Sequence, residues 1–475
     1  MPAPLDAIVV GSGPNGLAAA IALAKAGRSV RVYEAEATVG GAVRSAELTE
    51  PGFVHDTCST VHALALVSPF LKSLPLAAHG LSFAHPEAPV AHPLDDGTAV
   101  VVRRSLDETA DSLGADGRAY RRLFRPFVDR SDDLMEALLA PPRLRHPLLL
   151  ARFGRSAIRS ASGLARSRFS NERTRAMFAG VAAHSMVPLD KAATAGYGLG
   201  LLTAAHAVGW PVARGGSGEL SRALAAYLAS LGGEIVTGTR VEALAALPAA
   251  RVVLCDVTPR QFLALAGNAA NPRYRRRLAR YRYGPGVFKM DWALSRPVPW
   301  KARDCATAGT IHIGGSEPEI AHGEYESWNG RHADRPYAIV VQPTLFDTTR
   351  APRGMHTLWA YCHVPNGSTV DMRARIEQQI ERFAPGFREC IVAASAMGPA
   401  DLERRNANLV GGDIAGGAAD FAQFIARPIL SFHPYRAGAP GVFLCSSSTP
   451  PGVGVHGMCG YYAARSALAY LGDAE

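Results

Sequence analysis

The sequence predicts an α/β protein with two domains, one built on a parallel sheet and the other of the α+β class. Short apolar segments alternate with helical patterns near both ends of the chain, which is typical of a parallel sheet. Between them lie a long helical stretch and several alternating apolar runs that indicate a second sheet. With 475 residues, 48% of them hydrophobic, the chain can bury a large core.

The first apolar strand, residues 7–10, leads into a glycine turn and an alanine-rich helix that begins at about residue 17. The turn reads Gly11-Ser12-Gly13-Pro14-Asn15-Gly16. Gly11 permits the tight turn, Gly13 lets the backbone approach a pyrophosphate, and Gly16 lets the helix pack closely on the strand. The N-terminus of the helix would then face the phosphates of a dinucleotide.

A second strand, residues 29–33, ends at Glu34 and Ala35. The carboxylate of Glu34 lies about twenty residues beyond the glycines, where it can accept a hydrogen bond from a ribose hydroxyl. Strand, turn, helix and acid together predict a Rossmann-like dinucleotide-binding domain. A second glycine segment follows and favours FAD over NAD, because in many FAD proteins such a glycine doublet lets the chain pass along the pyrophosphate and ribityl. Its arginine can also neutralise phosphate charge. Its candidate cofactor-binding residues are Gly40, Gly41, Ala42 and Arg44.

The α/β pattern returns in the middle of the chain and at its end, where a glycine-rich loop again enters a helix. We therefore expect a discontinuous dinucleotide-binding domain made of residues 1–60, 205–265 and 430–475. The intervening residues, 61–204 and 266–429, would form an α+β substrate domain whose first part is mainly helical.

Three separated blocks, residues 9–45, 209–241 and 442–468, carry a resemblance to a known family. They resemble the phytoene desaturase-like branch of FAD-dependent oxidoreductases, which is related to the flavin amine oxidases. The resemblance implies a GR2-type FAD-binding fold in which the residues named above hold the adenosine and pyrophosphate and Val241 contacts the adenine. It also implies that the C-terminal loop borders the flavin and ribityl through Ser447, Gly452, Gly454 and Val455.

The resemblance implies an FAD-dependent oxidoreductase that dehydrogenates or saturates an apolar substrate by hydride transfer to or from flavin N5. The substrate would be isoprenoid, carotenoid-like or acyl-type. Because only one dinucleotide motif is visible, we expect no NADPH site, and oxygen or a quinone would accept the electrons. Three alternatives stay open: a flavin amine oxidase, a redox-neutral flavin isomerase, and a non-catalytic flavin-bound interaction protein.

Two residues are candidates for catalysis. Lys289 stands in a strand where the amine oxidase relatives place a lysine that holds a water near N5, and the alternative is a salt-bridged lysine at a strand edge. His456 could face the substrate or the flavin carbonyl, or it could be structural. We expect His55 and Asp56 to anchor the connection between the domains. Three isolated histidines should have core or surface roles: His62, His184 and His206.

Several classes of partner and site are not expected. The seven cysteines form no spacing with histidine that would build a metal site. No nucleic-acid-binding module accompanies the net charge of +9, so we expect no nucleic-acid partner. The first residues lack a secretion signal and the odd cysteine count favours reduced thiols, which together predict a cytoplasmic location.

A basic segment, residues 143–175, is the candidate for peripheral contact with a membrane. Arginines, the first of them Arg143, lie beside an apolar helical face, and such a helix could rest on anionic lipid. The alternative is a solvated face of the substrate domain. The apolar face is formed by Leu150, Phe153, Ala157, Ala161 and Leu164.

Overall fold

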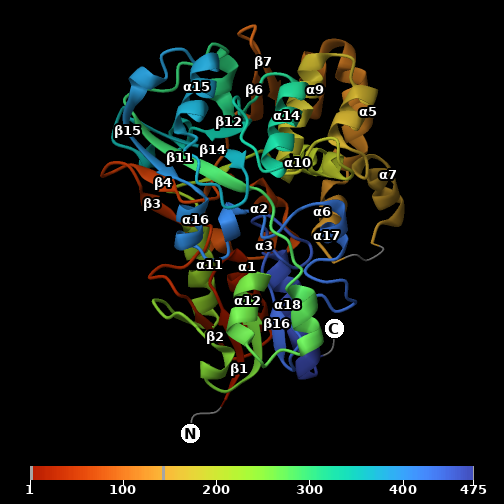
Figure 1. The fold of residues 1–475 in the computed structure, drawn as a ribbon, viewed down its shortest axis with the longest axis vertical. Helices are drawn as coiled ribbons and strands as arrows, with labels where there is room; N and C mark the ends of the chain where they lie inside the picture. The colour runs from red at the N-terminus through yellow and green to blue at the C-terminus, as the bar shows by residue number, and fades with distance from the viewer. Residues whose placement is uncertain (1–3, 142–144, 474–475) are drawn as a thin grey trace.

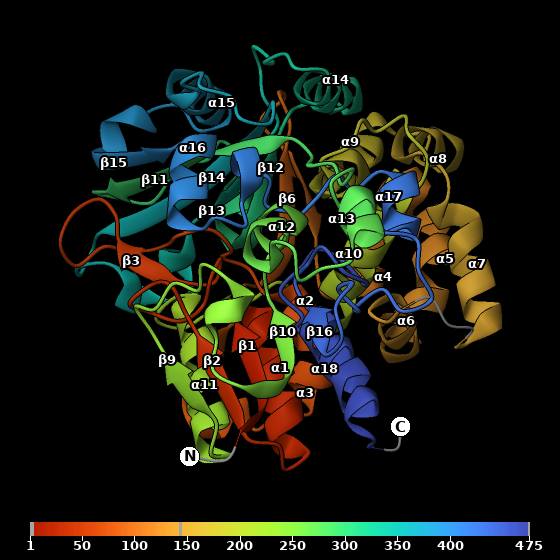
Figure 2. The same cartoon turned by 60° about the horizontal axis from the view of Figure 1, so that its bottom comes forward.

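The structure, a computed structural model, describes residues 4–141 and 145–473. Both described ends of the chain lie in the lower half of the molecule, which contains a parallel sheet flanked by helices (Figure 1). A larger sheet and a group of helices form the upper half (Figures 1 and 2). The candidate site lies where the two halves meet.

The lower sheet has five parallel strands in the order β16-β10-β1-β2-β9. All five strands lie in the three segments 1–60, 205–265 and 430–475. The mixed order shows that the chain leaves this sheet twice and returns to it. The strands are β1 (Leu5–Val10), β2 (Val30–Tyr33), β9 (Glu234–Val236), β10 (Ala250–Cys255) and β16 (Val442–Leu444).

Helix α1 (Pro14–Lys25) packs against α11 (Gly218–Ser230) and α18 (Met458–Leu471). Small residues allow this close packing. A Cβ atom on Gly460 of α18 would lie 1.8 Å from the carbonyl oxygen of Asn15, so only glycine fits there. The N-terminal motif and the C-terminal helix are therefore held side by side.

The upper sheet has seven strands in the order β15-β11-β14-β13-β12-β6-β7. Neighbours are antiparallel except β12 and β6, which run parallel. The strands are β6 (Ala88–Pro93), β7 (Ala99–Val102), β11 (Gly286–Leu294), β12 (Ala308–Ile313), β13 (Ala338–Val341), β14 (His356–Val364) and β15 (Ile391–Met397). Strands β6 and β7 come from the part expected to be mainly helical, where two prolines in β6 weaken the strand signal.

The two faces of this sheet lie in different surroundings, as the side chains of β11 show. Phe288, Met290 and Trp292 point into a core that is covered by α15 (Arg373–Phe383). Lys289 and Asp291 point to the other face, toward the parallel sheet, because successive side chains alternate. One face of the sheet thus packs into a hydrophobic core, and the other face borders the space between the two sheets.

The remaining helices of the upper half pack around α10 (Thr194–Val208), which contacts most of them. These are α4 (Leu106–Ser112), α5 (Gly117–Val128), α6 (Ser131–Leu138), α7 (Pro147–Ala157), α8 (Ala161–Arg168) and α9 (Glu172–Ala182). Short elements complete the fold: α2 (Ala63–Val67), α3 (Pro69–Lys72), α12 (Pro259–Ala266), α13 (Pro272–Leu278), α14 (Glu317–Trp328), α16 (Pro399–Arg405), α17 (Phe421–Ile425), β3 (Ser45–Glu47), β4 (Val54–Asp56), β5 (Phe83–Ala84) and β8 (Val212–Ala213).

The expectation that the basic segment presents one free apolar helical face is wrong. The apolar residues are divided between two helices, because α7 ends at Ala157 and Ser160 caps α8. A third helix, α9, begins within the segment. Phe153, Ala161 and Leu164 are buried in the protein, so this face packs inward and is not free to meet lipid. Arg143 lies outside the described residues. Within the described ranges, no helix is long and apolar enough to span a bilayer.

Candidate functional site

A cavity of about 600 Å³ runs from the glycine turn after β1 to the underside of the seven-stranded sheet. Most of the residues expected to bind the cofactor line this cavity. These are Gly11, Gly13, Pro14, Asn15, Glu34, Ala35, Gly41, Ala42, Arg44, Val241, Ser447, Gly454 and Val455. Gly16, Gly40 and Gly452 are not among the lining residues. The structure thus brings together residues from all three segments of the lower domain.

The glycine turn leaves no room for side chains. A Cβ atom on Gly16 would lie 2.1 Å from the carbonyl oxygen of Gly11, and one on Gly13 would lie 2.6 Å from a carboxylate oxygen of Asp256. Gly11 has a φ of +98°, which side chains rarely tolerate. The backbone at the start of α1 is therefore open to a close-fitting anion.

Glu34 is fixed at the end of β2 by hydrogen bonds to both carboxylate oxygens. The backbone N–H of Ser12 donates at 2.9 Å and the Ser12 hydroxyl at 2.6 Å to Oε2, while the N–H of Glu36 donates at 2.9 Å to Oε1. The carboxylate keeps lone pairs that face the cavity. This is the arrangement expected of a group that accepts from ribose hydroxyls.

Arg44 lies across the cavity from the glycine turn. Its Nε donates to the carbonyl of Gly41 at 2.9 Å and its Nη2 to the carbonyl of Arg405 at 3.0 Å. These two bonds hold the planar guanidinium in place and leave other N–H groups for a ligand. A positive charge thus borders the place where the glycine turn would receive a phosphate.

Asp256 is a site residue that the sequence analysis missed. It follows β10, and its Oδ2 accepts from the N–H of Gly16 at 2.8 Å, at the N-terminus of α1. Burial, reinforced by the charge of Glu34, raises its pKa to about 7. Its position at the carboxyl end of a parallel strand could have identified it, because ligands of open α/β sheets bind at that edge.

The structure places His456 outside the cavity wall, which corrects its selection as a catalytic candidate. The side chain is fully buried behind Gly454, and its Nδ1 accepts from the N–H of Met458 at 3.0 Å. Burial lowers its pKa to about 4. The side chain therefore stabilises the start of α18, which is the structural alternative.

Lys289 lines the cavity and forms an ion pair with Asp291, two residues along the same strand. Both side chains are buried, and burial raises the pKa of Asp291 to about 6 despite the opposing effect of Lys289. The Nδ1 of His55 lies 3.5 Å from Oδ1 of Asp291. Because β11 is an interior strand, Lys289 is not at a strand edge.

The upper end of the cavity is mainly apolar and aromatic. Trp359 and Tyr361 of β14 meet edge to face, with ring centroids 5.1 Å apart, and Nζ of Lys289 lies 5.9 Å from the ring of Trp359. His62 and His184 also line the wall, although we expected core or surface roles for them. The apolar residues of this end include Val61, Leu64, Leu201, Trp210, Val287 and Ile339.

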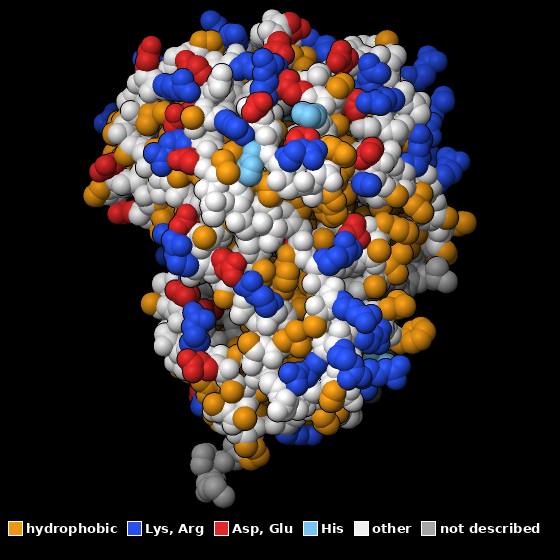
Figure 3. Space-filling view, viewed as in Figure 1, with side chains coloured by type: hydrophobic (Ala, Val, Ile, Leu, Met, Phe, Trp, Pro, Cys, Tyr) orange, Lys and Arg blue, Asp and Glu red, His pale blue; other side chains and the backbone are white. Residues whose placement is uncertain are grey.

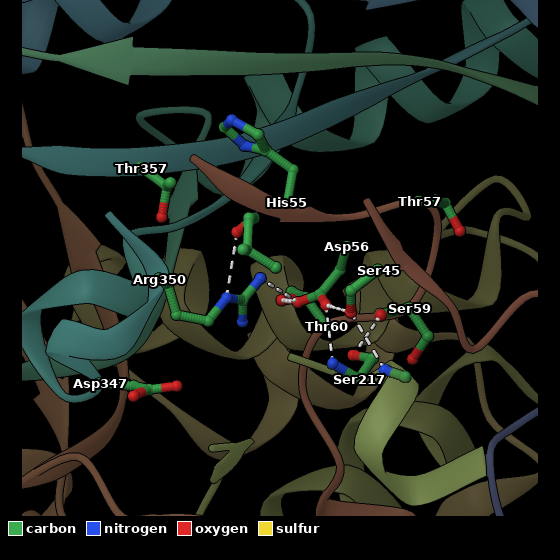
Figure 4. Close-up of polar contacts among 12 residues, drawn as sticks. Ser45, His55, Asp56, Thr57, Ser59, Thr60, Ser217, Asp347, Arg350 and Thr357 are labelled. Carbon is green, nitrogen blue, oxygen red and sulfur yellow. Dashed lines mark hydrogen bonds and ion pairs between the residues drawn. The ribbon is translucent and has the colours of Figure 1, made fainter. Parts of the chain in front are cut away.

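A buried polar network lies behind this wall and joins the halves of the molecule (Figure 4). Asp56 accepts from the hydroxyl of Ser45 and the N–H of Ser217, each at 2.7 Å, and from the hydroxyl of Thr60. Arg350 completes the network at 2.9 Å from Oδ2 of Asp56. Asp56 thus holds β4 against the start of α11 within the lower half, and its pair with Arg350 joins it to the upper half.

Comparison with known proteins shows which families the chain is similar to. A model described as "NAD(P)-binding Rossmann-like domain" matches residues 9–74. Phytoene dehydrogenase of Streptomyces griseus is 28% identical over 95% of this chain and 92% of its own length. The chain resembles the phytoene desaturase-like oxidoreductases. The Rossmann-like fold and the resemblance inferred from the sequence are confirmed.

Two further proteins extend the comparison. "Pyridine nucleotide-disulfide oxidoreductase domain-containing protein 2" of Mus musculus is 26% identical over 97% of this chain and 92% of its own length. The structure of putrescine oxidase bound to putrescine matches with a TM-score of 0.61 and 18% identity, covering 98% of this chain and 99% of the other. The latter likeness shows a shared fold. The chain is thus similar to a phytoene dehydrogenase over most of its length and shares its fold with an amine oxidase.

Proposed function

We propose that the protein is an FAD-dependent oxidoreductase that dehydrogenates or saturates an apolar isoprenoid, carotenoid-like or acyl-type substrate. The observation that carries this proposal is one continuous cavity, whose lower end can receive a dinucleotide and whose upper end is apolar. Such a cavity can hold a redox cofactor and an apolar substrate in contact with each other.

The described residues fit FAD at the lower end. The glycine turn offers backbone N–H groups at a helix N-terminus, Arg44 offers a positive charge, and Glu34 offers an acceptor for the ribose. The buried Oδ1 of Asn15 has no hydrogen-bond partner among the described residues. FAD supplies an acceptor or donor of hydride at flavin N5 when bound.

The side chains of the protein would bind and orient the substrate and exclude water from it. Trp359, Tyr361 and Ile339 offer flat apolar surface along the sheet, and their burial limits the access of water to a reacting C–H bond. Dehydrogenation of a C–C bond releases a proton as well as a hydride. We assign the acceptance of that proton to the Lys289–Asp291 pair, because Lys289 lines the cavity.

A flavin amine oxidase is the second candidate, and a specific observation favours it. Trp359 and Tyr361 stand beside Lys289 on the same wall, which gives the aromatic surroundings that an amine substrate would need. Putrescine oxidase shares the fold. Stoichiometric oxygen uptake with an amine would favour this activity, whereas apolar chains should support the first proposal.

The experiment that tests the proposal is anaerobic titration of the purified protein followed by visible absorption. Flavin bleached by an apolar chain and reoxidised by oxygen or a quinone would support the dehydrogenase. Product formation without net bleaching or oxygen uptake would support the redox-neutral isomerase instead. A flavin that no substrate class reduces or isomerises would favour the non-catalytic interaction protein.

Peripheral membrane contact of a cytoplasmic protein stays a proposal, but a different surface supports it. Exposed apolar side chains gather in residues 421–432, where Leu430 is 65% and Phe432 fully exposed. Arg277 donates to the carbonyl of Leu430, so basic residues adjoin this surface. Figure 3 shows apolar and basic side chains next to each other on this flank. Such a surface suits anionic lipid.

A further inference from the structure

A short segment of the upper half, residues 405–408, reaches the part of the cavity that the lower half offers to a dinucleotide. The segment follows α16, which packs against β11 and β15 of the seven-stranded sheet. Arg405 and Asn406 nevertheless line the cavity together with the glycine turn. Both halves of the molecule therefore contribute to the wall around the expected cofactor.

Hydrogen bonds hold this segment against the chain that follows β10. Oδ1 of Asn408 accepts from the backbone N–H of Thr258 at 2.9 Å, and its Nδ2 donates to the carbonyl of Asp256 at 3.0 Å. Nε2 of Gln261 donates to the carbonyl of Ala407 at 2.6 Å. These three bonds fix the position of the segment beside the carboxyl end of a parallel strand.

The side-chain amide of Asn406 has a defined orientation. Its Oδ1 lies 3.1 Å from the backbone nitrogen of Asn408, which can only donate, so the atom at this position is the oxygen. The other atom, Nδ2, is therefore the donor. None of the hydrogen bonds among the described residues uses Nδ2 of this half-buried side chain. Its two N–H groups are thus free to bind a ligand.

The free amide lies beside both glycine segments of the site. A Cβ atom on Gly41 would lie 3.8 Å from Nδ2 of Asn406 and 3.1 Å from the Cα atom of Gly13. One point in space is thus close to the donor and to the two glycines that we expect to border the pyrophosphate. From this position Nδ2 can reach an oxygen of the pyrophosphate.

The same segment also holds the positive charge of the site. The carbonyl of Arg405 accepts from Nη2 of Arg44 at 3.0 Å. A pyrophosphate is negatively charged, and hydrogen bonds to a charged oxygen are stronger than those between neutral groups. Residues 405 and 406 therefore act on one region of the cavity, the first by orienting Arg44 and the second by offering a donor.

We propose that Asn406 donates from Nδ2 to the pyrophosphate of FAD, so that a residue of the upper half completes the cofactor site of the lower half. Bound FAD then connects the two halves in addition to supplying the redox chemistry. This inference rests on the proposed function, because it specifies how the cofactor of the same cavity is bound.

The test measures the dissociation constant of FAD from the full-length protein, by the fluorescence of flavin that is released on dilution. Asn406→Asp keeps the shape of the side chain and the oxygen that accepts from Asn408, but places a carboxylate beside the phosphates. We expect the dissociation constant to rise at least about tenfold, because repulsion replaces a hydrogen bond to a charged group.

The matched control is Asn268→Asp, which makes the same charge change at an exposed side chain. Asn268 accepts from Arg275 at 2.8 Å and is not among the residues that line the cavity. Because solvent and salt screen such a charge, the dissociation constant of FAD should stay within about twofold of the wild-type value. Equal FAD affinity of Asn406→Asp and this control would overturn the inference.

A crystal structure of the wild-type protein with its flavin tests the same contact without a variant. Nδ2 of Asn406 should lie within about 3.2 Å of a pyrophosphate oxygen, and a separation above about 4 Å would contradict the proposed contact. Neither measurement uses a substrate. A bound flavin that no substrate reduces would therefore count against the proposed function alone, so the two failures are distinguishable.

Discussion

Arg350 and Asp56 form a fully buried ion pair, with Nη2 of the arginine 2.9 Å from Oδ2 of the aspartate. Nε of Arg350 also donates to the carbonyl of Val54 at 3.1 Å. The pair connects the loop after β13 to β4, and through Ser217 to the start of α11. It stands directly behind the cavity, since His62 of the wall is 2.9 Å from the hydroxyl of Ser217.

Arg350→Met should destabilise the protein by about 3 kcal/mol, because it leaves the Asp56 carboxylate buried without its counter-charge. Chemical denaturation measures the loss. The control is Arg296→Met, which removes an exposed pair with Glu389 and should cost less than about 1 kcal/mol. Adding Asp56→Asn to Arg350→Met should cost less than the sum of the single changes. Strict additivity would show that the two side chains do not interact.

Asp256→Asn should change how stability depends on pH. The pKa of Asp256 is about 7 in the folded protein against 3.8 for an ordinary aspartate, so between these values the folded state binds more protons. Its contribution to stability is greatest below about pH 4 and falls as pH rises toward 7. The asparagine variant does not lose this stability as the pH rises. Its melting temperature, relative to wild type, should therefore be higher at pH 8 than at pH 5, and parallel melting curves would contradict the assignment.

Lys289→Met should slow flavin reduction by an apolar substrate roughly tenfold to a hundredfold, because the charge facing the reacting bond is lost. Stopped-flow absorption under anaerobic conditions measures the rate. The flavin content should be unchanged, since Lys289 lies at the upper end of the cavity. The control Val392→Ser alters an exposed residue of β15 and should leave the rate as in wild type. Unchanged reduction by the methionine variant would leave Lys289 with a structural role.

Phe432→Ser combined with Leu430→Ser should weaken sedimentation with anionic phosphatidylserine vesicles at least about fivefold, because both side chains are exposed and would enter the interface. Stability should not change. Val392→Ser, also exposed but on β15, serves as the matched control. Equal sedimentation of all three proteins, or none by wild type, would reject this surface as a lipid contact.

Local patterns predicted the dinucleotide fold well, because its signature is contained in one strand, turn and helix. Features that depend on contacts between distant parts of the chain were harder to predict from the sequence. Strand β6 is stabilised by pairing with β12, more than 200 residues away, and its prolines masked it. The helical periodicity of the basic segment was real, but the pattern could not tell that Phe153 and Leu164 face the protein rather than lipid.

The candidate site shows the same division. Lys289 could be selected from the resemblance to the amine oxidases, and Asp291 could have been added because residues two apart share a face of a strand. His184 could not be selected, because its ring reaches the cavity wall only in the folded chain, where it contacts His312, 128 residues away. His456 was misplaced because a glycine-rich loop does not reveal which of its side chains turn inward.

The central claim is that the glycine turn holds FAD, and the visible spectrum of purified wild-type and Gly13→Val protein tests it most directly. The wild-type protein should show a flavin spectrum and release FAD on denaturation. The variant should be colourless, because a side chain at position 13 begins with a Cβ atom 2.6 Å from the Asp256 carboxylate. A wild-type protein that neither contains nor takes up FAD, or a variant that retains it fully, would contradict the claim.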